Sequence, residues 1–154
     1  MAEPVLILGA TFEQLYRILL IGILPAWLLL IVVPRAGITR VLVHSVIPAL
    51  LLGGVYALLI ARGAGASVAP QALFSLSGWL ALFGTEQAVL AGLAHYLVFD
   101  LFAGAWQVRD AAKRGVPHLA VIPCLILTFV LGPLGLMLYI LVRTAFGRGG
   151  LALD

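Results

Sequence analysis

Asp100 is the residue best placed to do chemistry, because it lies well inside an apolar run at residues 87–106. A charged Asp near the centre of a bilayer costs roughly 2.5–3.5 kcal/mol on insertion scales. Such a side chain is expected to face protein or a cavity, and to be paired or protonated. Two interpretations stay open: a buried acid or base, or a hydrogen bond that fixes the packing of two helices.

His95 and Glu86 are further candidates for acid–base work on the same predicted helix. His95 lies five residues before Asp100, about 140° around a helix, so the two side chains occupy different faces. The Asp100 face also carries Glu86 and Tyr96, and the other face carries His95, Phe99, Phe102 and Trp106. Both faces could border one cavity. The structural alternatives are an interhelical hydrogen bond for His95 and a place in the first helical turn for Glu86.

The sequence predicts neither a metal site nor a cofactor. The three histidines are scattered, with no H-x-x-H, H-x-x-x-H or E-x-x-H spacing, and no glycine-rich nucleotide motif is present. Cys124 is the only cysteine, so neither an internal disulfide nor a multi-thiolate site can form. His44 and His118 are expected at the membrane interface, and Cys124 as a small buried side chain.

The composition places these residues in a membrane. Hydrophobic residues make up 64% of the 154 residues and charged residues 10%, against roughly 45–50% and 25% in soluble domains. Too little polar surface remains to cover a soluble fold. The net charge is +3, and the basic residues stand at the ends of apolar runs without clustering. Lipid headgroups, and not nucleic acid, are therefore the expected partners.

Four apolar segments have the length of about 20 residues that a transmembrane helix needs; they are residues 15–33, 41–61, 87–106 and 119–142. Residues 63–70 are expected to be a linker, and residues 71–84 a short interfacial or re-entrant helix. Thr85 is expected to cap the third span. We predict one all-α integral membrane domain over residues 1–154, a bundle of about four transmembrane helices plus the short helix, with both termini on one side.

Prolines interrupt the predicted spans at positions 25, 48, 123 and 133. Each removes an N–H and frees a carbonyl one turn back, which is tolerated where neighbours or a cavity satisfy the freed group. The run GPLG at residues 132–135 is expected to form a kink with close helix contact. Ordinary packing and a cavity wall are both compatible with it.

Three strings resemble one family of membrane proteins: HYLVFDLFAGAW at residues 95–106, RGVPH at 114–118 and PCLILTFVLGPLGLMLY at 123–139. The family is called neoxanthin-synthase-like or abscisic-acid-deficient-four-like, and the resemblance covers most of the chain. The matching positions that it implies are His95, Asp100, Phe102, Gly104, Trp106, Pro117, Pro123, Cys124, Thr128, Phe129, Gly132, Pro133 and Gly135.

Plant members of that family are needed to turn violaxanthin into neoxanthin, so the resemblance implies a carotenoid or another isoprenoid as ligand. The reaction is a redox-neutral isomerisation that needs an acid at the epoxide oxygen, a base at carbon and no cofactor. Because a carboxyl group in apolar surroundings tends to keep its proton, Asp100 could be the acid, with His95 or Glu86 as base. The substrate-binding residues expected are Tyr96, Phe99, Phe102, Trp106, Thr128 and Phe129.

Three functions therefore compete. The first is an isomerase of an epoxy-carotenoid or a related isoprenoid. The second is a noncatalytic membrane protein that binds or delivers such a lipid, or assists assembly of a membrane complex. The third is a small transporter, for which more polar residues aligned through several spans would be expected. The Ala-, Leu-, Gly- and Arg-rich composition suggests the inner membrane of a bacterium, and a homo-oligomer is compatible with the sequence.

Overall fold

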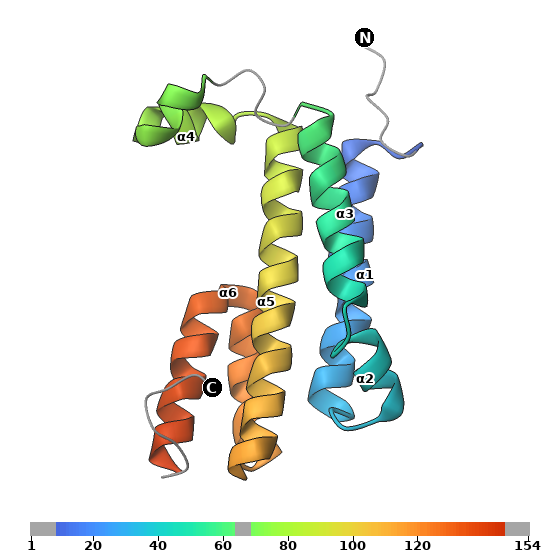
Figure 1. Cartoon of the computed structure of the whole chain (residues 1–154), viewed down its shortest axis with the longest axis vertical. Coiled ribbons are helices and arrows are strands. Elements are labelled where there is room, and N and C mark those ends of the chain that lie inside the picture. The colour runs from blue at the N-terminus through green and yellow to red at the C-terminus, as the bar shows by residue number, and fades with distance from the viewer. Residues whose placement is uncertain (1–8, 64–68, 147–154) are drawn as a thin grey trace. The chain divides into compact units, whose positions relative to one another are not determined.

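The computed structural model describes residues 9–63 and 69–146, and these residues form helices and no strand. The elements are α1 (Phe12–Val32), α2 (Gly37–Leu42), α3 (Ile47–Ala61), a 3-10 helix η1 (Pro70–Phe74), α4 (Leu76–Leu82), α5 (Glu86–Arg114) and α6 (His118–Ala145) (Figure 1). Most of the predicted linker, residues 64–68, lies outside the described residues.

Four helical segments are long and apolar enough to cross a membrane: α1, the stretch Gly37–Ala61 that holds α2 and α3, α5 and α6. The all-α membrane fold with four apolar segments is thus confirmed. Apolar side chains cover both the buried and the exposed face of helix α1, as expected for a helix surrounded by lipid. Leu19 and Leu30 are buried, whereas Ile21 and Val32, each at least 65% exposed, are just as apolar.

The second predicted span is not one continuous helix. Helix α2 ends at Leu42 and α3 begins at Ile47, because the Ser45 hydroxyl accepts from the Ile47 amide and donates to the Val41 carbonyl. Pro48 follows in the first turn of α3, where a missing N–H costs little. The Thr39 hydroxyl donates to the Val33 carbonyl at 2.6 Å, which ties α2 to the end of α1.

The chain divides into two compact units, and each is described by itself. Unit 1 holds the residues up to Leu24 and Pro48–Val98; unit 2 holds Pro25–Ile47 and the residues from Phe99 onward. In unit 1, the Gln87 side chain donates to the Leu59 carbonyl at 2.9 Å, which joins α3 to α5. Leu59, Ala88 and Ala91 are buried beside this bond, and the small alanines allow close approach.

In unit 2, α6 reverses its direction. At Leu131 the backbone leaves the helical region (φ −140°, ψ 51°), and the second half of α6 runs back along the first (Figure 1). The partners of α6 on α5 show the same reversal. Along the first half of α6 the partners shift towards the start of α5, because Thr128 contacts Gln107 and Gly132 contacts Asp100. Along the second half they shift towards the end of α5, where Tyr139 contacts Asp110.

Gly135 permits this reversal. A Cβ added at Gly135 would lie closer than 3.0 Å to the backbone nitrogen of Thr128, so the two halves of α6 touch backbone to backbone. Residues 128 and 135 would be about 10 Å apart along the axis of a straight helix. Pro133 stands in the first turn of the returning half, where proline is favoured. The predicted kink at residues 132–135 is therefore confirmed, and at this kink the chain reverses its direction.

Candidate functional site

A cavity of about 340 Å³ lies in unit 1 where α3, α4 and the first part of α5 meet. Its walls are mainly aromatic and aliphatic, and its polar groups come from a tyrosine and a histidine. Its lining includes Tyr56, Trp79, Leu82, Phe83, Ala91 and His95. A few polar groups in an otherwise apolar cleft of this size are typical of small-molecule sites. The sequence candidate His95 therefore lies in a pocket, which we call the His95 pocket.

Local structure in α4 positions the aromatic wall of the His95 pocket. Ser75 caps α4 by accepting from the Gly78 amide at 3.1 Å. The Trp79 indole N–H donates to the Leu73 carbonyl at 2.8 Å, and the Trp79 and Phe83 rings stack with centroids 6.1 Å apart. A Cβ at residue 92 would lie 2.8 Å from the Phe83 ring, so Gly92 leaves the space that this ring fills.

Tyr56 and His95 bring proton-exchanging groups to the cavity from two different helices. Their ring centroids are 5.8 Å apart and the rings are tilted by 54°. Tyr56 is 37% exposed and Trp79 46% exposed, so the pocket is open to its surroundings on one side. A phenol can donate a proton and a neutral imidazole can accept one. The pair could thus exchange protons with a bound apolar molecule.

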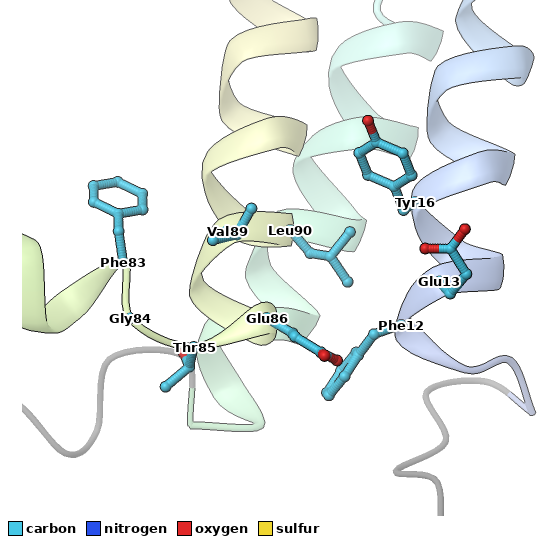
Figure 2. Close-up of a pocket in the computed structure, with 9 residues that line it drawn as sticks. All are labelled: Phe12, Glu13, Tyr16, Phe83, Gly84, Thr85, Glu86, Val89 and Leu90. Atoms are coloured by element: carbon cyan, nitrogen blue, oxygen red, sulfur yellow. The ribbon is translucent and has the colours of Figure 1, made fainter.

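Glu86 lines a second cavity of unit 1, of about 390 Å³ (Figure 2). Figure 2 shows its carboxylate directed towards Phe12 of α1. The Thr85 hydroxyl accepts from the Ala88 amide at 3.2 Å, which confirms the predicted cap. Glu13 also lines this cavity, but it is exposed and paired with Arg17 at 2.7 Å. Glu86 and His95 therefore line separate cavities, which share Phe83 as a wall.

Asp100 lies in unit 2, against the turn of α6. It is half-buried, and a Cβ at Gly132 would collide with one oxygen and the carbon of its carboxyl group. The Asp100 side chain thus lies where the returning half of α6 begins. It faces protein, as predicted from its insertion cost, and it is not among the residues that line the His95 pocket.

The predicted substrate-binding residues separate into two groups. Thr128 and Phe129 belong to the packing of the α6 turn: the Thr128 hydroxyl accepts from Gln107 at 2.8 Å and donates to the Cys124 carbonyl, and Phe129 packs on Trp27. Along α5 the aromatic residues differ in exposure. Phe99 and Phe102 are at least 60% exposed, Tyr96 is half-buried, and Trp106 packs edge-on against Tyr139. Their ligand-binding role stays a prediction.

The sequence reasoning missed a charged cluster in unit 2. The Asp110 carboxylate is 2% exposed and accepts from the Tyr139 hydroxyl at 2.5 Å, from Arg114 at 2.8 Å and from Arg143 at 3.3 Å. Arg143 is itself fully buried. From the sequence, Arg143 was expected at the end of an apolar run, where basic residues meet lipid headgroups. Asp110 and Arg143 are both buried because the turn at Leu131 brings the end of α6 back beside Asp110.

The other histidines bond to backbone or to arginine. His118 lies 2.9 Å from the Ile31 carbonyl, and His44 lies 3.3 Å from the Pro34 carbonyl and 3.2 Å from the Arg109 guanidinium. Because Arg109 can only donate, the facing nitrogen of His44 accepts and its other nitrogen donates to Pro34. Within residues 9–63 and 69–146, no three His, Cys, Asp or Glu side chains gather as metal ligands would.

Comparisons with known proteins point to one family. A family model described as ABA DEFICIENT 4-like matches residues 14–139. The Arabidopsis thaliana protein described as "Protein ABA DEFICIENT 4, chloroplastic" is 30% identical over 105 residues, which are 62% of this chain. The match spans 46% of that protein, so this chain corresponds to about half of its length. No solved structure matches the chain.

Proposed function

We propose, from the premise that this chain belongs to the ABA DEFICIENT 4-like family, that it binds the ring end of a carotenoid or related isoprenoid in the His95 pocket and isomerises an epoxide there. The observation that carries the proposal is the pocket itself. It combines aromatic walls and an imidazole, and its partly exposed side chains allow entry from lipid. The match to a plant relative makes an epoxy-carotenoid the substrate class to test first.

The reaction requires an acid at the epoxide oxygen, a base at carbon and an apolar site that holds the ring. One C–O bond of the epoxide breaks and its oxygen gains a proton, while a neighbouring carbon of the polyene loses one. The products of this rearrangement are an alcohol and an allene, with no change of oxidation state. We assign the base to His95, whose neutral imidazole can accept the proton from carbon. Trp79 and Phe83 would hold the ring against it by apolar contact.

The binding step can be tested with Trp79→Ala, which removes one wall of the pocket. Wild-type protein, purified in detergent from carotenoid-producing cells, should carry pigment that solvent extracts. Trp79→Ala should retain about tenfold less, equivalent to about 1.4 kcal/mol. Leu80→Ala is the matched control, because Leu80 lies next to Trp79 on α4, is 69% exposed and does not line the pocket. Equal pigment in both variants would place the ligand elsewhere.

The conversion step needs a separate assay. An epoxy-carotenoid is added to the purified protein in lipid, and the products are separated and checked for an allenic isomer of unchanged mass. His95→Ala should abolish the isomer. Wild-type protein that neither binds pigment nor forms the isomer, while remaining folded, would refute the proposed function.

A noncatalytic carrier is the second candidate, and one observation favours it. Asp100, the first candidate for the catalytic acid from the sequence, packs against Gly132 and does not line the His95 pocket. A carrier would need only the aromatic walls. Pigment binding without any isomer, in the wild-type protein, would decide for the carrier. We further propose that the chain resides in the inner membrane of a bacterium, which fractionation of its native cells can test.

A further inference from the structure

We propose that Tyr56 is the catalytic acid of the His95 pocket, the group that protonates the epoxide oxygen; the inference rests on the proposed function. Tyr56 comes from α3, in an apolar segment without any other polar side chain, and nothing in the sequence connects it with His95. The fold places the two rings 5.8 Å apart on the same cavity. A proton donor and a proton acceptor thereby face one small volume.

The position of Tyr56 is fixed by the junction of α3 and α5. Leu59, one turn after Tyr56, is fully buried, and its carbonyl accepts from the Gln87 side chain at 2.9 Å. On α5, Gln87 and Ala91 lie on one face, one turn apart, and Ala91 lines the pocket. Because backbone and side-chain contacts both hold α3 against α5 here, the Tyr56 ring is held at the pocket.

The Tyr56 hydroxyl is available to a ligand. It makes no hydrogen bond with any residue of the described ranges 9–63 and 69–146, although tyrosine hydroxyls away from water usually find a partner. The other hydrogen-bond donor among the aromatic walls, the Trp79 indole N–H, already donates to the Leu73 carbonyl. Among the described residues that line the cavity, Tyr56 and His95 are thus the two that can exchange protons.

The proposed step is balanced in atoms and charge. The Tyr56 hydroxyl gives its proton to the epoxide oxygen as the C–O bond breaks. His95 takes a proton from the neighbouring chain carbon, whose C–H electron pair forms the new double bond of the allene. Tyr56 is then a phenolate and His95 an imidazolium. Transfer of one proton from His95 to Tyr56 restores both groups, so the cycle consumes no reagent.

The test is Tyr56→Phe, which keeps the ring as a wall and removes only the hydroxyl. Single-turnover conversion of an epoxy-carotenoid should fall by at least about 100-fold, the usual scale for loss of a general acid. Pigment retention should stay within about twofold of wild type. Tyr16→Phe is the matched control, since Tyr16 lines the Glu86 cavity and is similarly exposed at 42%; it should convert at the wild-type rate.

The possible results separate the two proposals. Tyr56→Phe that converts substrate at the wild-type rate would overturn the role of Tyr56 and leave the proposed function standing. Wild-type protein that binds pigment without converting it would overturn the role as well, in favour of a carrier. A Tyr56→Phe variant that loses binding and conversion together would also overturn it, because the hydroxyl would then hold the ligand. Loss of conversion alone, with an unchanged melting temperature, is the expected outcome.

Discussion

Gly135→Ala should destabilise the protein strongly, because the reversal of α6 leaves no room for a side chain there. The added Cβ would meet the backbone nitrogen of Thr128 at less than 3.0 Å, and backbone cannot move aside as a flexible side chain can. Overpacking typically costs about 1–3 kcal/mol, and a backbone clash belongs at the upper end. At roughly 2–4 °C per kcal/mol for a chain of this size, the melting temperature should fall by about 6–12 °C.

The chain carries its own probe for this measurement. Cys124 is the only cysteine and is fully buried on α6, so a thiol-reactive dye reports the temperature at which α6 unpacks in detergent. Gly22→Ala is the matched control, since an added Cβ in α1 meets nothing within 4 Å and alanine favours a helix over glycine by about 0.5–1 kcal/mol. Gly135→Ala melting within about 2 °C of Gly22→Ala would show that α6 does not turn back at this point.

Two further predictions concern unit 2. Asp110→Asn leaves Arg143 buried without its carboxylate and should lower the free energy of unfolding by about 3–5 kcal/mol. Glu13→Gln is the control at an exposed ion pair and should lower it by less than about 1 kcal/mol. Equal melting temperatures of the two variants would contradict the buried cluster. Each half of α6 is about 20 Å long at ~1.5 Å per residue, which is too short to cross the ~30 Å hydrocarbon core. Single cysteines that replace Lys113 or Phe146, in a Cys124→Ala background, should therefore react with an impermeant maleimide from the same side of the membrane. Labelling from opposite sides would favour a straight α6.

The helices could be predicted from the sequence because lipid imposes one simple rule, a run of about 20 apolar residues for each span. That rule does not predict whether an apolar run continues as one straight helix or turns back on itself. Both halves of α6 are mainly apolar, so hydropathy alone predicted one crossing and placed both termini on one side. The GPLG run indicated a kink, but the extent of the turn depends on the contact between Thr128 and Gly135, which composition does not reveal.

The candidate site was predictable only in part, for a related reason. His95 and Asp100 stood out because placing a polar side chain in an apolar membrane segment costs free energy. Tyr56 did not, since tyrosine is common in membrane helices and its nearness to His95 arises from the bond between Gln87 and Leu59, 28 residues apart. The burial of Asp110 could not be predicted, because its partners Tyr139 and Arg143 reach it only after α6 has reversed.

The reversal of α6 also bears on the role of Asp100, which the sequence left open between catalysis and packing. A helix that begins inside a membrane has backbone N–H groups without partners in its first turn, and its dipole places partial positive charge there. A carboxylate at that point satisfies both needs, and Asp100 lies against Gly132, where the returning half begins. We infer that Asp100 stabilises the start of this half-helix. Because Asp100 does not line the His95 pocket, the acid of the reaction is to be sought at Tyr56.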